Sequence, residues 1–106
     1  MKKNTNLIPL EWGDQVIQIK EYLPIEDKIG VIERIVNQSL DDNNFANPAR
    51  IMINTVLEVI FAYTTNINFT DKQKEDRLGL YDLLVSSGLW KAIENKLAEV
   101  GELSII

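Results

Sequence analysis

Paired carboxylates are the side chains that could most readily carry acid–base chemistry in this 106-residue sequence. Three such pairs are present: Glu26 with Asp27, Glu75 with Asp76, and Glu94 with Glu99. Each pair is predicted to lie on the polar face of a helix, where water surrounds both carboxylates. We therefore interpret these pairs as surface charge.

Glu58 differs from the other acidic residues because it lies within an apolar run, Ile51 to Tyr63. A carboxylate buried among apolar side chains requires a cationic partner, which Arg34 or Arg50 could supply. We predict a buried charge at Glu58 and favour a structural or interface role for it over a catalytic one.

Other chemistry has few residues to use, because the sequence contains no His and no Cys. It therefore lacks the commonest general base, the thiol nucleophile and the preferred zinc ligands. Calcium loops starting at Asp41 or Asp42 fail, since neither frame has a glycine at its sixth position or a glutamate at its twelfth. No glycine-rich phosphate-binding loop is present. We predict a protein that is not an enzyme, with no catalytic residues, no metal and no cofactor.

The charge and hydropathy of the chain limit the partners and the cellular locations that we expect for it. Sixteen Asp and Glu residues outnumber 11 Lys and Arg, and the formal net charge of −5 disfavours a nucleic-acid partner. The apolar run Ile51 to Tyr63 is shorter than the about 20 residues that a membrane helix needs, and no signal peptide is recognisable. We expect no membrane segment, and a chain without Cys fits a reducing cytoplasm.

Residues 6–22 are predicted to form a β-hairpin. Gly13-Asp14 is typical of a tight type I′ or II′ turn, and Ile17 and Ile19 alternate with polar residues as in a half-buried strand. Pro9 cannot donate a ladder hydrogen bond, so the first strand is expected at an edge. The hairpin should pack one apolar face on the helices, consisting of Ile8, Leu10, Trp12, Ile17 and Ile19.

Residues 24–100 are predicted to form a compact bundle of about four helices, so that residues 1–106 make a single, mainly α domain of the α+β class with the hairpin packed on the bundle. Pro24 begins the first helix, whose expected core stripe is Ile25, Ile29, Ile32, Val36 and Leu40. Asn47 caps a buried central helix over about 48–65. Thr70 and Gln73 match a capping box for a third helix, in which Gly79 predicts a bend or break between Asp76 and Leu80. The last helix follows Gly88, with a stripe of Leu89, Ile93, Leu97 and Val100.

Several aromatic side chains, together with the apolar residues at positions 103, 105 and 106, are the candidate protein contacts. They are Trp90, Trp12, Tyr22 and the apolar residues Leu103, Ile105 and Ile106. For Trp12 and Tyr22 we favour core packing, whereas for Trp90 and Ile105-Ile106 both interpretations stay open. The oligomeric state also stays open, because the apolar residues 103–106 and the hairpin leave surface that a second copy could cover.

Two stretches resemble a known group of proteins. They are Ile19-Lys-Glu-Tyr-Leu-Pro-Ile-Glu-Asp-Lys-Ile29, and Thr65-Asn-Ile-Asn-Phe-Thr-Asp-Lys-Gln-Lys-Glu-Asp76 followed by Leu80-Tyr-Asp-Leu-Leu-Val-Ser-Ser-Gly-Leu89. The chain from Val16 to Leu97 resembles small acidic proteins that bacteriophages and prophages of Gram-positive bacteria encode among their virion genes. The layout of a hairpin followed by helices is also similar to that of phage tail assembly chaperones.

The resemblance implies a non-catalytic virion or morphogenesis protein that works through protein–protein contacts in tail or head assembly. Its partners would be the capsid, tail tube or tape-measure protein, or further copies of itself. It would act in the host cytoplasm during assembly and could remain in the virion. The alternative is a phage-encoded host-takeover or anti-defence inhibitor, whose acidic helical face mimics nucleic acid or occupies a host enzyme.

Overall fold

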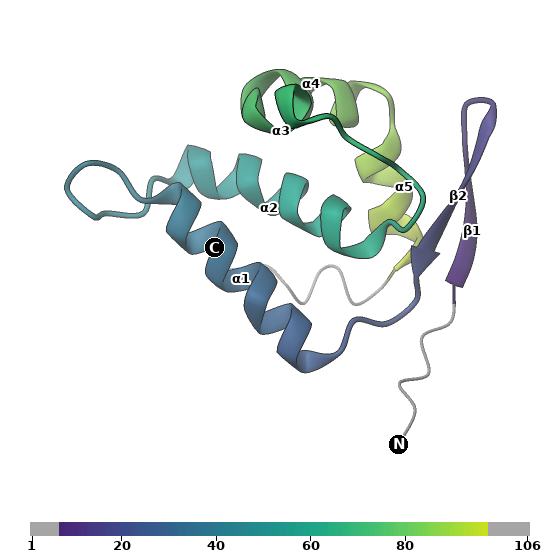
Figure 1. The fold of residues 1–106 in the computed structure, drawn as a ribbon, viewed down its shortest axis with the longest axis horizontal. Coiled ribbons are helices and arrows are strands. Elements are labelled where there is room, and N and C mark those ends of the chain that lie inside the picture. Colours follow the sequence, from purple (N-terminus) through teal and green to yellow (C-terminus); the bar gives the residue numbers. More distant parts are fainter. Residues whose placement is uncertain (1–6, 98–106) are drawn as a thin grey trace.

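The computed structural model describes residues 7–97, which form two antiparallel strands followed by five helices (Figure 1). This arrangement confirms the predicted class, mainly α with an N-terminal hairpin. The strands are β1 (Leu7–Trp12) and β2 (Gln15–Lys20), and the helices are α1 (Ile25–Ser39), α2 (Pro48–Tyr63), α3 (Asp71–Glu75), α4 (Arg77–Ser86) and α5 (Leu89–Lys96). Five helices replace the expected four because the third predicted helix is divided at Asp76.

The hairpin turns at Gly13, as predicted. Gly13 has a φ of 60°, which the absence of a Cβ permits, and Asp14 keeps a negative φ, so the turn is of type II′. Trp12 pairs with Gln15 next to the turn. The expected face packs inward: Leu10, Ile17 and Ile19 are buried, and Ile8 and Trp12 are partly buried against the core.

The outer edge of β2 is bound by the segment that follows α2. The amide of Gln18 donates to Oδ1 of Asn66 over 2.9 Å, and Nδ2 of Asn66 donates to the carbonyl of Val16 over 3.1 Å. The backbone N–H of Thr65 donates to the carbonyl of Gln18 over 3.1 Å. On β1, the register places Pro9 in a pair whose backbone groups point away from β2, so its missing N–H removes no bond of the hairpin.

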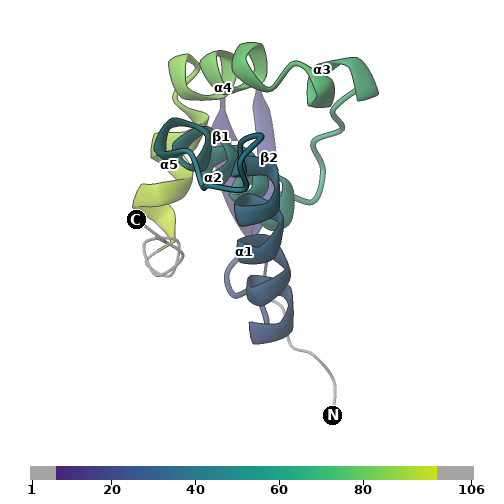
Figure 2. The ribbon, with the colours of Figure 1, turned by 90° about the vertical axis from the view of Figure 1, so that its left-hand side faces the viewer.

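Helix α2 is the central element, as its apolar sequence predicts. The side chain of Asn47 accepts hydrogen bonds from the amides of Ala49 and Arg50 and so caps the first turn. The core residues of this helix are Val56, Leu57, Val59, Ile60 and Tyr63. Helices α1, α4 and α5 all pack on it (Figures 1 and 2). It ends at Tyr63, two residues before the expected end, where Thr64 takes an extended conformation.

The core stripe predicted for α1 is wrong in most of its members. The buried face of α1 consists of Val31, Ile35 and Ser39, which we call the buried ridge. Ile25 and Ile29 remain 63% and 48% exposed, and Val36 is also exposed. The apolar residues of α1 cover a wider arc of the helix than α2 can bury. The predicted stripe followed the edge of this arc and not its centre. Pro24 lies one position earlier than expected, as the N-cap residue.

The segment from Thr70 to Leu97 contains the predicted capping box and a break at the first residue of the predicted interval, Asp76 to Leu80. Thr70 and Gln73 form the predicted capping box. The break falls at Asp76, whose carboxylate then caps α4 by accepting from the amide of Gly79. A Cβ at position 79 would collide with that carboxylate. Gly79 is therefore not the break itself but leaves space for the cap beside it.

Helix α5 follows Gly88, whose left-handed φ of 84° turns the chain. Leu89, Ile93 and Leu97 form its buried stripe, as predicted. Val100 and the predicted contact residues Leu103, Ile105 and Ile106 lie outside the described residues.

Candidate functional site

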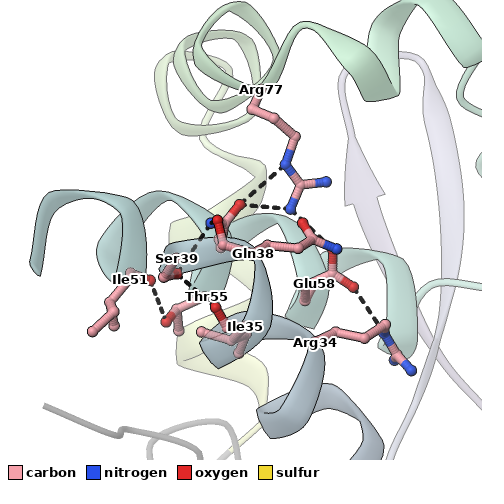
Figure 3. A network of polar contacts seen from close by, with 9 residues as sticks. Arg34, Ile35, Gln38, Ser39, Ile51, Thr55, Glu58 and Arg77 are labelled. Carbon is pink, nitrogen blue, oxygen red and sulfur yellow. Dashed lines mark hydrogen bonds and ion pairs between the residues drawn. The ribbon is translucent and has the colours of Figure 1, made fainter. Parts of the chain in front are cut away.

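Glu58 is a buried charge, as predicted, and two arginines bind it. The residue is only 5% exposed and lies on α2. Nε of Arg34, on α1, lies 3.0 Å from Oε1 of Glu58. Nη2 of Arg77, at the start of α4, lies 3.0 Å from Oε2 (Figure 3). One carboxylate thus joins three helices.

Asn54 extends these contacts one turn towards the N-terminus of α2. Its Oδ1 accepts from Nε and Nη2 of Arg77 over 3.0 and 2.7 Å. Its Nδ2 donates to Oγ of Ser39 over 3.1 Å and to the carbonyl of Gln38 over 3.3 Å. The Ser39 hydroxyl donates in turn to the carbonyl of Ile35, within α1 (Figure 3). We call Arg34, Ser39, Asn54, Glu58 and Arg77 together the Glu58 network.

The Glu58 network is fully paired within the described residues, where every buried side-chain nitrogen and oxygen has a hydrogen-bond partner. Both carboxylate oxygens of Glu58 accept hydrogen bonds from guanidinium groups, one from Arg34 and one from Arg77. The guanidinium of Arg77 also lies 5.9 Å from the centroid of the Phe61 ring. The arrangement locks α1 and α4 onto α2, which agrees with the structural role predicted for Glu58.

A hollow of about 370 Å³ lies beside the network. Its walls include Phe61 and Phe69, whose ring centroids are 5.2 Å apart, and the cationic Lys74 and Arg77. The charge of Arg77 is already opposed by Glu58, so only Lys74 is left to attract an anion there. Glu58, Thr64 and Asn68 also line the hollow, and the Glu58 carboxylate is already bound by Arg34 and Arg77.

The sequence identified one of the two partners of Glu58. Arg34 was predicted correctly. Arg50 was wrong, because it lies on α2 itself, about 12 Å along the helix axis from Glu58, and its Nη1 donates to the carbonyl of Leu40. Arg77 was missed because it lies 19 residues beyond Glu58 in the sequence, on another helix. The signal was present in Asp76 and Gly79, which start a new helix at Arg77 and turn its side chain onto α2.

The predicted aromatic contact residues lie in different environments. Trp12 is partly buried against the core, and its Nε1 lies 3.4 Å from the carbonyl of Ser87. Trp90 is also partly buried against the core. Tyr22 does not join the core as favoured: it is half exposed, and Nζ of Lys28 lies 4.5 Å from its ring centroid. The structure does not bring these three residues into one site.

Further large apolar side chains are exposed on several elements. Leu7 and Val16 lie on the hairpin, Phe45 in the loop before α2 and Met52 on α2, and the others lie on α1 and α4. On α1 they are Ile25, Ile29 and Val36, which together with the half-buried Ile32 we call the outer stripe of α1. On α4 they are Leu78 and Val85, which lie within about 20° of each other around the helix, and Leu83, which lies about 140° from Leu78; we call the three together the α4 patch. The residues of the outer stripe were predicted to be core, because an apolar helical pattern does not show how much of it a neighbouring element covers.

The described residues form no recognisable metal site or membrane helix, and similarity to known proteins gives no function. Within residues 7–97, no three His, Cys, Asp or Glu side chains are grouped as a metal ion would require. None of the helices described there is long and apolar enough to cross a membrane. This chain matches no protein family, curated protein or solved structure with which it was compared. The interpretation of its surface therefore depends on its own residues.

Proposed function

We propose that this chain is a non-catalytic phage virion or morphogenesis protein that acts through protein–protein contacts. Its partners are capsid, tail-tube or tape-measure proteins or copies of itself, and it works in the host cytoplasm during assembly and remains in the virion. The two stretches quoted above, residues 19–29 and 65–89, support the phage origin by their resemblance.

The observation that carries a protein-binding role is the exposure of large apolar side chains on regular helices. The outer stripe of α1 and the α4 patch belong to helices, not to loops, so their side chains are presented in a fixed arrangement. Exposed apolar surface of this kind is typical of protein interaction sites. The polar residues that could have formed a reactive site, those of the Glu58 network, bind one another instead.

Purified particles of the phage that encodes the chain would test the proposal. Mass spectrometry of virions is expected to detect the protein, and deletion of its gene is expected to stop or impair particle assembly. If the protein is absent from virions and the deletion leaves assembly intact, the proposal is wrong. Early expression, absence from particles and the capture of one host protein would instead favour a host-takeover or anti-defence inhibitor.

A further inference from the structure

We propose that the outer stripe of α1 is the docking site for a basic, amphipathic helix of a partner protein. The inference rests on the proposed function and names the surface and the partner chemistry through which the protein acts.

The geometry of the stripe fits a helix. Its residues recur at intervals of four, three and four over Ile25 to Val36, about 17 Å of helix. At about 100° per residue they fall within an arc of about 60°, centred about 90° from the buried ridge. This is the spacing with which the ridges of one helix pack against another.

The position of α1 leaves the stripe open to such a partner. Among the described elements α1 packs chiefly on α2, and it lies at an outer margin of the fold (Figures 1 and 2). Of the network residues on α1, Arg34 lies about 170° from the centre of the stripe, and Ser39 is fully buried in the ridge against α2. A helix docked on the stripe would therefore leave the network intact.

Charge on one margin of the stripe selects the sign of the partner. Lys28 lies about 40° beyond the opposite edge, next to Ile32, so the acidic margin is the one formed by Glu26 and Glu33. Glu33 and Glu26 are exposed and lie about 40 to 60° beyond the edge of the stripe, on the side away from the buried ridge. The residues that follow them around the helix, Asn37 and Gly30, carry no charge. Lys or Arg residues that flank an apolar stripe on a partner helix would face these two glutamates, and the chain's net charge of −5 adds long-range attraction.

The same charges disfavour the two occupants that the chain itself could provide. In an antiparallel pair of α1 helices, the acidic margins of the two copies would face each other. A parallel pair would need Lys28 to reach Glu33 of the other copy, whereas Lys28 lies over the ring of Tyr22. Residues 98–106 are apolar enough to cover the stripe, but their charged side chains are Glu99 and Glu102, of the same sign as its margin.

Two synthetic helical peptides test the proposal against the full-length chain. One carries leucines at intervals of three and four residues with lysines on both flanks, and the other replaces every lysine by glutamate. We expect fluorescence anisotropy to show binding of the lysine peptide at least about tenfold tighter than that of the glutamate peptide at low salt. Added salt should reduce the difference.

Variants at exposed positions assign the binding to the stripe. Ile29→Gln should weaken the binding of the lysine peptide at least about tenfold. The matched variant Leu83→Gln, in the α4 patch, should leave the binding affinity unchanged. The double reversal Glu26→Lys/Glu33→Lys should invert the preference between the peptides. The control Asp82→Lys/Glu94→Lys makes the same change in net charge at exposed positions on α4 and α5 and should preserve the preference for the lysine peptide.

Three results would overturn the proposal. The first is equal or absent binding of both peptides. The second is a dimer in light scattering that Ile29→Gln dissociates, which would assign the stripe to a second copy. The third is a tenfold gain in peptide affinity on Leu103→Gln/Ile105→Gln, which would assign it to residues 98–106. Any of these results together with the protein's presence in virions would leave the proposed function standing and reject only this docking site.

Discussion

The two arginines of the Glu58 network are expected to contribute very unequally to stability. Replacing Arg77 by Met removes the donor to one oxygen of Glu58 and both donors to Oδ1 of Asn54. Each buried acceptor left without a donor costs about 1–3 kcal/mol, so we expect Arg77→Met to lower the free energy of unfolding by about 3–4 kcal/mol. That is a large part of the stability of a domain of this size.

Arg34→Met should cost much less. Arg34 makes one hydrogen bond to Glu58, and its side chain is 53% exposed compared with 26% for Arg77. Water can replace the lost donor at that side of the carboxylate, so we expect a loss of no more than about 1 kcal/mol. Arg50→Met serves as the matched control, because the hydrogen bond described for the Arg50 side chain goes to the backbone carbonyl of Leu40 and to no residue of the network.

Urea unfolding followed by circular dichroism would measure these differences. The double variant Glu58→Leu/Arg77→Met should be less destabilised than the sum of the two single variants, since it removes a charge together with its partner. Equal losses for Arg34→Met and Arg77→Met would refute the reasoning, because burial and bond number would then not determine the contribution of each arginine. Additive effects of Glu58→Leu and Arg77→Met would refute it as well.

Three further predictions concern the ends of the helices and the hairpin. Gly79→Ala should fail to stabilise α4, because the new Cβ would displace the capping carboxylate of Asp76, although alanine is favoured over glycine in helices by about 1 kcal/mol. In an Asp76→Ala background the same change should raise the free energy of unfolding by about 1 kcal/mol, as measured by chemical denaturation. Asn47→Ala should lower the free energy of unfolding by about 1 kcal/mol, since the amides of the first turn of α2 lose their acceptor, and an unchanged urea midpoint would contradict this. Asn66→Ala should speed amide hydrogen exchange at Gln18 while leaving the exchange of the α2 core unchanged, because the Asn66 side chain is the acceptor for that amide.

Local patterns in the sequence predicted the elements well. The Gly13 turn, the Asn47 cap and the capping box of Thr70 and Gln73 depend on residues close to one another along the chain, and the structure confirms all three. The burial of α2 was predictable for a similar reason, because a helix that is apolar on nearly every side has to be surrounded.

Relationships between distant elements were harder to predict. The need of Glu58 for a cation follows from its apolar surroundings, but nothing in the local sequence shows that Arg77, on another helix, is close to it. The prediction that the stripe of α1 forms the core was wrong for the same reason. Its periodicity is real, yet α2 covers only the side with Val31 and Ile35 and leaves Ile29 exposed, and that choice depends on the packing angle between the two helices.

The binding of Asn66 and Thr65 to one border of the hairpin, and the presence of Pro9 at the other, have a consequence for self-assembly. A two-stranded ribbon with open borders invites further strands from neighbouring molecules, which leads to aggregation. Here one border already has its backbone groups engaged, and proline interrupts the other. Addition of a foreign strand is thus disfavoured at both borders of the hairpin.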